Sequence, residues 1–82
     1  MKTEEEVYLT LRQLMSEMFE LSPEIITLDA NLIEDLDIDS IDAVDLMVRL
    51  RDITGKRINP EDFKNARTIQ NVVDTVYRIS LT

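Results

Sequence analysis

The chain is 82 residues long, carries a net charge of −8 and contains neither cysteine nor histidine. This length predicts a single domain over residues 1–82 with a thin hydrophobic core. The lack of cysteine excludes disulfides and thiolate metal sites and favours the cytoplasm. The lack of both the usual general base and the usual strong nucleophile argues against a free-standing enzyme, and the acidic excess argues against nucleic acid and anionic membranes as ligands.

A first amphipathic helix is predicted in the segment TEEEVYLTLRQLMSEMF. Thr3 and Glu6 have the spacing of a capping box, which stabilises the start of a helix. Apolar residues then recur as they do on one buried helix face: Val7, Leu11, Leu14 and Met18. The acidic N-terminus lacks the apolar centre of a signal peptide, and no apolar run approaches the ~20 residues of a membrane span.

A long connection follows, over residues 21–39. Ser22 and Pro23 predict a short helical turn, because proline suits the first position of a helix. Five apolar residues keep one side of the connection hydrophobic: Ile25, Leu28, Leu32, Leu36 and Ile38. Loops of this length are unusual in a small domain unless they pack or carry function, so we expect this one to pack.

The second helix is predicted to be capped by Asp39 or Ser40, to run to about Ile53 and to stop at Gly55 in a left-handed conformation. At ~100° per residue, its apolar side chains form two separate groups. The larger group, the core stripe, consists of Ala43, Leu46, Met47, Leu50 and Ile53. The smaller group, the apolar strip, consists of Ile41, Val44 and Val48.

Two more helices complete the predicted fold. NPEDF predicts a short third helix, with Asn59 as cap and Pro60 at the first position. TIQNVVDTVYRI predicts a last helix that Thr68 caps. The buried face of this last helix consists of Ile69, Val72, Val73, Val76 and Ile79. The predicted fold class is all-α, a four-helix bundle of three longer helices and a short third one, with a long loop between the first and second.

Six carboxylates surround Ser40 without an intervening basic residue. This acidic belt consists of Glu34, Asp35, Asp37, Asp39, Asp42 and Asp45. The sequence matches the pattern of a calcium-binding loop at Asp35, Asp37 and Asp39. It lacks the glycine and the final glutamate that such a loop requires, so no metal site is expected. Ser40 itself lies where a helix start favours an anion, including a phosphate attached to the serine, although a plain N-cap is the simpler interpretation of this residue alone.

The apolar strip exceeds what one helix of a small bundle needs to bury. Either the long loop covers it, or it is a docking patch with a charged rim. We favour docking. The residues expected to contact partners are Ile41, Asp42, Val44, Asp45 and Val48.

The complete pattern resembles the acyl carrier protein family. The family hallmark is Asp-Ser-Leu followed by an acidic residue at the start of the second helix, and here it reads Asp39-Ser40-Ile41-Asp42. The resemblance extends over nearly the whole chain, through LSPEIITLDANL before the motif, Gly55 and INPEDF after it, and the last helix that begins with TI. The order and distances make it far more specific than a bare Asp-Ser pair.

The resemblance implies a carrier rather than a catalyst. A separate phosphopantetheinyl transferase would attach 4′-phosphopantetheine from coenzyme A to Ser40, with Asp39 as part of the motif. The arm would hold acyl intermediates as thioesters for fatty-acid or polyketide-type biosynthesis. The implied partners are ketosynthase, reductase, dehydratase or acyltransferase enzymes with basic docking surfaces, and the carrier would be a monomer. The chain also resembles, more weakly, specialised carriers of secondary lipid or polyene pathways.

Two features depart from the family pattern. Asp37 stands where many members have glycine, and Arg49 and Arg51 interrupt a second helix that usually stays acidic. The excess of acidic over basic residues is confined to the first part of the chain. Residues 1–48 hold 13 acidic and 2 basic side chains, whereas residues 49–82 hold 4 acidic and 7 basic ones.

Two alternatives remain open at this point. A peptidyl or D-alanyl carrier would share the serine but load an amino acid, although the acidity of residues 34–45 favours the acyl type. A helical protein-interaction module without a prosthetic group would use Ser40 only as a helix cap.

Overall fold

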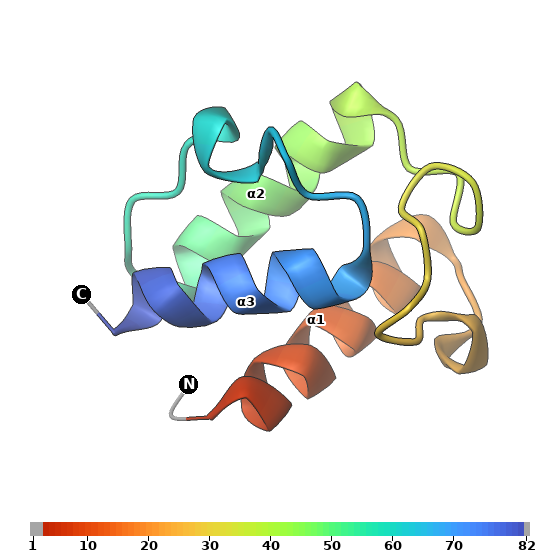
Figure 1. The fold of residues 1–82 in the computed structure, drawn as a ribbon, viewed down its shortest axis with the longest axis horizontal. Coiled ribbons are helices and arrows are strands. Elements are labelled where there is room, and N and C mark those ends of the chain that lie inside the picture. The colour runs from red at the N-terminus through yellow and green to blue at the C-terminus, as the bar shows by residue number, and fades with distance from the viewer. Residues whose placement is uncertain (1–2, 82) are drawn as a thin grey trace.

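The computed structural model describes residues 3–81, and three α-helices form its frame (Figure 1). They are α1 (Glu4–Phe19), α2 (Ser40–Thr54) and α3 (Ile69–Ser80). Two short 3₁₀ helices, η1 (Pro23–Ile25) and η2 (Pro60–Phe63), lie in the connections. The all-α prediction is confirmed. None of the helices within residues 3–81 is long and apolar enough to cross a bilayer.

The predicted short third helix is the 3₁₀ helix η2 rather than a turn of α-helix. Its bonds join residues three apart, as between the Lys64 N–H and the Glu61 carbonyl. A four-residue segment cannot close many α-type bonds, and Pro60 at its start contributes no N–H, so the tighter 3₁₀ geometry is favoured.

The predicted helix starts are confirmed by their capping bonds. The side chains of Thr3, Asp39 and Thr68 each accept the backbone N–H of the third residue of the helix that follows. Gly55 ends α2 with a φ of 68°, and its N–H donates to the carbonyl of Arg51 at 2.9 Å. A glycine adopts this left-handed conformation without the steric cost that a Cβ would add.

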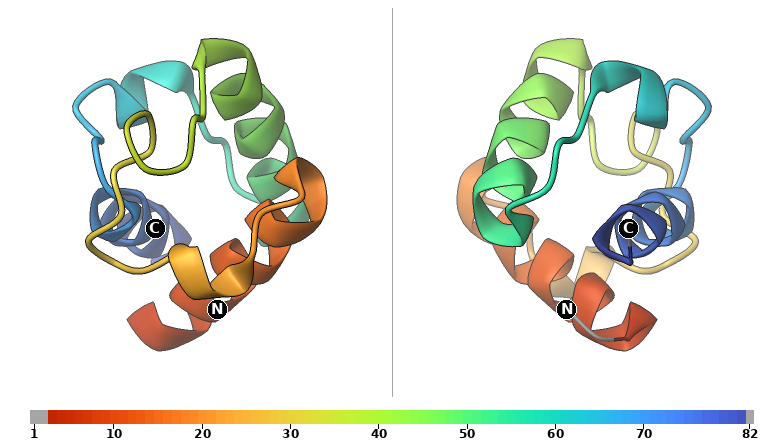
Figure 2. Two further views of the ribbon diagram at one scale, coloured as in Figure 1. Left: turned by 90° about the vertical axis from the view of Figure 1, so that its right-hand side faces the viewer. Right: turned by 90° about the vertical axis from the view of Figure 1, so that its left-hand side faces the viewer.

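The core lies where α1 packs across α3, and Figure 2 shows α2 and α3 on opposite sides of the interior, with α1 below both (Figures 1 and 2). Val7, Leu11 and Met15 of α1 are fully buried there, together with the predicted apolar face of α3, whereas Leu14 and Met18 of the predicted face of α1 are only partly buried. Ile79 is the exception in α3, since it is only partly buried near the C-terminal end. Leu46 and Leu50 are the buried residues of α2.

Two core predictions are wrong. Ile53 of the core stripe is 48% exposed, because α2 ends one residue later and Ile58 of the following segment is buried instead. In the long connection Ile26 is buried, whereas Ile25 and Leu28 of the predicted apolar side are exposed. The 3₁₀ turn has three residues per turn, which places the residue after it toward the core, and the Tyr8 hydroxyl donates to the Ile26 carbonyl at 2.6 Å.

The long connection packs against the start of α3, as predicted, through backbone hydrogen bonds. The Leu32 N–H donates to the Arg67 carbonyl at 2.9 Å, and the Ile69 N–H donates to the Ala30 carbonyl at 3.0 Å. The first N–H groups of a helix lack partners within it, so Ile69 satisfies its donor in this way. The connection is therefore fixed beside α3 just before it enters α2.

Candidate functional site

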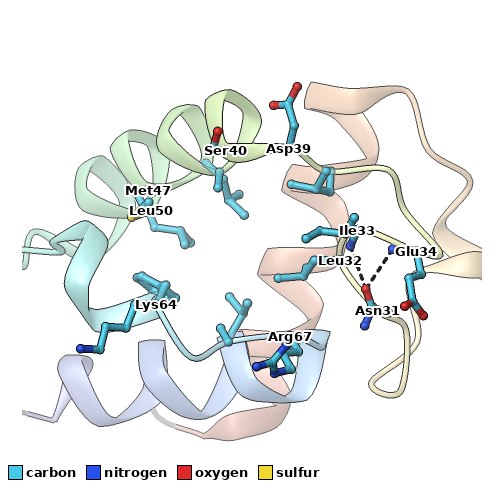
Figure 3. A pocket seen from close by; sticks show the side chains of 16 residues that line it. Asn31, Leu32, Ile33, Glu34, Asp39, Ser40, Met47, Leu50, Lys64 and Arg67 are labelled. Atoms are coloured by element: carbon cyan, nitrogen blue, oxygen red, sulfur yellow. Dashed lines mark hydrogen bonds between the residues drawn. The ribbon is translucent and has the colours of Figure 1, made fainter.

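Ser40 is the first residue of α2, and its side chain is exposed. Asp39 is the N-cap: its Oδ1 accepts the Asp42 N–H at 2.9 Å, and its own N–H donates to Asp42 Oδ2 at 3.4 Å. The interpretation of Ser40 as a plain cap is therefore wrong. Among residues 3–81 no group forms a hydrogen bond with the Ser40 hydroxyl, which points away from the protein in Figure 3.

A tight turn lies in the connection shortly before α2. Asn31 Oδ1 accepts the N–H groups of Ile33 at 3.0 Å and Glu34 at 2.9 Å (Figure 3). Asp35 Oδ2 in turn accepts the Asn31 N–H at 2.7 Å. Side chains of Asn and Asp that bond the backbone in this way fix a turn without regular secondary structure.

Asp37 has a left-handed backbone, with a φ of 55°. It stands at the position where the family resemblance predicts glycine, and the structure gives the physical reason for that preference. Left-handed conformations favour glycine because other residues crowd their Cβ against the carbonyl, although Asp tolerates them better than most. The chain thus keeps a glycine-type turn with an acidic residue in it.

Three members of the acidic belt are engaged in caps of the backbone. The carboxylates of Asp35, Asp39 and Asp42 each accept a backbone N–H group. Within the part of the chain that the structure describes, no group of three or more His, Cys, Asp or Glu side chains is placed to hold a metal ion.

A cavity of about 500 Å³ opens beside Ser40, between α2, the connection and η2. In Figure 3 the serine lies at its rim, while the side chains of Met47, Leu50 and Leu32 point into it. The charged residues of its lining are Glu34, Asp39, Lys64 and Arg67, and its apolar members are Leu32, Ile33, Ile38, Ala43, Leu46, Met47, Leu50, Phe63, Ala66 and Val72.

This cavity is the part of the site that the sequence interpretation missed. The predicted core stripe includes Ala43 and Met47, but both are only half-buried because they face this space. Phe63 comes from η2, whose approach to α2 no periodicity encodes. The only sign of a cavity in the sequence is the small side chain of Ala43 among the larger residues of the core stripe.

The predicted docking residues lie on the outward face of α2. Ile41 is 72% exposed, Val44 48% and Val48 49%, so the long connection does not cover the apolar strip. Asp45 is exposed, whereas Asp42 is half-buried by its capping role. Ile33, exposed on the connection, adds an apolar residue near the start of α2 that was not predicted.

Comparison with known proteins agrees with this arrangement. Residues 10–76 match the protein family described as a phosphopantetheine attachment site. The chain is 46% identical over 74 residues to acyl carrier protein 2 of Ralstonia nicotianae, which covers 90% of this chain and 91% of that protein. It is 31% identical over 77 residues to the meromycolate extension acyl carrier protein of Mycolicibacterium smegmatis, covering 94% and 78% respectively.

The fold is also similar to that of an acyl carrier protein. It is similar to the solved structure of the acyl carrier protein from Enterococcus faecalis, with a TM-score of 0.75 and 28% identity over 94% of this chain and 98% of that one. Sequence, fold and an exposed serine at the start of the second helix therefore agree, and this chain belongs to the acyl carrier protein family, which carries acyl groups on phosphopantetheine.

Proposed function

We propose that Ser40 is the residue that bears the 4′-phosphopantetheine arm of this acyl carrier. The observation that supports the proposal is an exposed hydroxyl without a partner, in the first turn of α2 and at the rim of an apolar cavity. The hydroxyls of Ser16 and Ser80, in contrast, donate to backbone carbonyls at 2.6 and 2.7 Å. A transferase that approaches from solvent finds the Ser40 hydroxyl accessible.

The attachment replaces one bond to phosphorus by another. Ser40 Oγ loses its proton and forms a P–O bond to the phosphate that carries pantetheine, while the bond to the departing adenosine bisphosphate of coenzyme A breaks. The new phosphodiester adds a negative charge to the acidic belt. Its position at the N-terminus of α2 offsets that repulsion, since a charge at this end of a helix is stabilised by about 0.3–1 kcal/mol.

The cavity beside Ser40 gives the arm a place for its cargo. We infer that the acyl chain folds back from the serine and enters between Met47, Leu50 and Leu32. Each methylene that leaves water for such an apolar space contributes about 0.8 kcal/mol, so a chain of several carbons gains enough to remain there between encounters. The gain is lost again when an enzyme draws the chain out.

The carrier presents acyl groups to biosynthetic enzymes rather than transforming them. The proposed partners are ketosynthases, reductases, dehydratases and acyltransferases, which would contact Ile41, Val44 and Val48 through apolar surface and the belt through basic side chains. We further propose that the protein acts as a monomer in the cytoplasm.

The attachment is tested by incubating the protein with coenzyme A and a broad-specificity phosphopantetheinyl transferase and recording the intact mass. The expected result is one added phosphopantetheine on the native chain and none on Ser40→Ala. Ser22→Ala is the matched control, because Ser22 is also exposed and its side chain forms no capping bond. An unmodified native chain, or normal modification of Ser40→Ala, would contradict the proposal.

A further inference from the structure

Four side chains of α2 form a row that begins at Ser40. Each residue of an α-helix is rotated by about 100° from the one before, so Val44, Met47 and Arg51 follow Ser40 at about 40°, 340° and 20° around the axis. This row runs along the edge of the cavity, which Ser40 and Met47 both line. Arg49 is closer to Ser40 in the chain but lies at about 180°, on the opposite side of the helix. A group that extends from the Ser40 hydroxyl along α2 therefore reaches Arg51 and not Arg49.

The length of this row matches the length of the phosphopantetheine arm. At 1.5 Å per residue, Arg51 lies about 16.5 Å beyond Ser40 along the helix axis. The arm has about 14 bonds between Ser40 Oγ and its sulfur, and an extended chain advances about 1.2 Å per bond, as a polypeptide does with three bonds in about 3.6 Å. The extended arm therefore measures about 17 Å, which brings the acyl group at its end beside Arg51.

The far end of the row borders a recess of about 410 Å³ whose lining is positively charged on balance. Arg51, Lys56 and Arg57 contribute three positive charges to this recess, against one negative charge from Asp52. Within residues 3–81 no carboxylate forms an ion pair with Arg51 or Arg57. The helix dipole stabilises a cation only in the last turn, so it accounts for Arg51 but not for Arg57. Two such guanidinium groups in one recess suit a carboxylate, which a guanidinium binds through two parallel N–H groups.

An acyl group that ends in a carboxylate is unsuited to the apolar cavity beside Ser40. Moving an ionised carboxylate out of water without a partner costs several kcal/mol. A short chain gains about 0.8 kcal/mol for each buried methylene, so two or three methylenes do not offset this cost. Lys64 and Arg67 border the cavity, but both are exposed and lie at its edge. Cargo of this kind therefore needs a polar site outside the cavity.

We propose that the recess at the end of α2 is a second cargo site, which holds acyl groups that end in a carboxylate through the guanidinium groups of Arg51 and Arg57. Apolar chains enter the cavity, whereas carboxylated cargo lies outside it, at the end of the row that begins at Ser40. Asp52 weakens the attraction of the recess for an anion, so its removal should strengthen the site. The inference rests on the proposed attachment of the arm to Ser40.

The thiol of the arm allows a direct test, because the chain itself contains no cysteine. The phosphopantetheine form is alkylated with ¹³C-labelled iodoacetate, which leaves a carboxymethyl group at the end of the arm. The acid dissociation constant of this carboxyl group is then measured by ¹³C NMR at low salt, where screening is weak. A guanidinium beside a carboxyl group favours its ionised form. We expect the dissociation constant to fall about threefold in Arg51→Gln, to stay close to the native value in Arg51→Lys and to rise in Asp52→Asn.

Arg49→Gln is the matched control, because it removes the same charge from an exposed position of the same helix, on the side away from Ser40. It should change the dissociation constant by less than about 1.5-fold, since its charge lies farther from the recess. Equal constants in the native protein and Arg51→Gln, or equal effects of Arg49→Gln and Arg51→Gln, would overturn the inference.

A larger effect of Arg67→Gln than of Arg51→Gln would also overturn it, because the carboxylate would then lie at the edge of the cavity. The intact mass separates this inference from the proposed function. A native chain that acquires no arm refutes the function, whereas normal loading followed by any of the three contrary results refutes only the second cargo site.

Discussion

Truncation of neighbouring apolar residues in α2 should separate folding from docking. Val48 and Leu50 are two residues apart in the same helix, but Leu50 is 1% exposed and Val48 is 49% exposed. Leu50→Ala should destabilise the fold and Val48→Ala should not. Conversely, Val48→Ala should slow transfer of the acyl group to partner enzymes, because it removes apolar docking contact.

The magnitudes follow from burial. Leu→Ala changes in a core cost about 2–5 kcal/mol, and we expect about 2–3 kcal/mol here because Leu50 already borders the cavity and loses fewer packing contacts. For Val48, two methyl-sized groups at about 0.8 kcal/mol each, half exposed, give a loss of about 0.8 kcal/mol. Alanine regains about 0.5 kcal/mol as the better helix former, so the net change is within about 0.5 kcal/mol.

Urea denaturation followed by helical circular dichroism measures both variants. A domain of this size has a free energy of unfolding of about 4–12 kcal/mol, so Leu50→Ala removes a large share and shifts the melting temperature by roughly 10–20 °C. Leu46→Ala and Val44→Ala provide an independent pair with the same contrast in exposure. If Val48→Ala proved as destabilising as Leu50→Ala, the apolar strip would be core, and the docking surface would have to lie elsewhere.

Three other predictions concern charge and backbone. Repulsion within the acidic belt should make the melting temperature rise with salt, mostly below ~0.15 M, where screening already acts over ~8 Å, and a flat salt titration would show that the belt does not destabilise the fold. The free energy of unfolding of Asp37→Gly should exceed that of Asp37→Ala by at least about 1 kcal/mol, since both variants remove the charge but only glycine suits a φ of 55°. Equal free energies of unfolding in urea would contradict this explanation. Asp45→Lys should lower both the association rate with a partner enzyme and the salt dependence of that rate, without unfolding the protein. Asp42→Lys should in addition lower the free energy of unfolding by about 1 kcal/mol, because it removes a capping interaction. Equal melting temperatures for these two variants would contradict the capping role.

Local chemistry made much of this fold predictable from the sequence. The caps Thr3 and Thr68 bond backbone N–H groups only three residues away, and Gly55 ends its helix through the conformation of its own backbone. Neither effect depends on what the helix packs against. The buried face of α3 followed from spacing alone, because its apolar residues recur with the period of a helix. The family motif then predicts Ser40, among several serines, as the attachment site.

Features that depend on contacts between distant segments were not predictable in the same way. The helical spacing of apolar residues in α2 predicts that Ile53 is buried in the core. Whether a side chain at the helix end is covered, however, depends on the path of the next segment. The cavity exists because η2 and the connection approach α2 without filling the space beside Ala43. Exposure of the apolar strip was a choice between two interpretations, and only the path of the connection beside α3 decides it.

The site and the fold make opposite demands on the same few residues. A thin core gains stability from every buried methyl group, yet the cavity leaves about 500 Å³ unfilled where α2 could pack more closely. The belt concentrates like charges before and at the start of that helix, where three of its members accept backbone N–H groups and so offset part of the repulsion. A larger residue at Ala43 would improve packing only by occupying the space proposed for the acyl chain. Under the proposed function, the loose packing of α2 follows from carrying an acyl chain, since the residues that would stabilise the helix are those that would close the site.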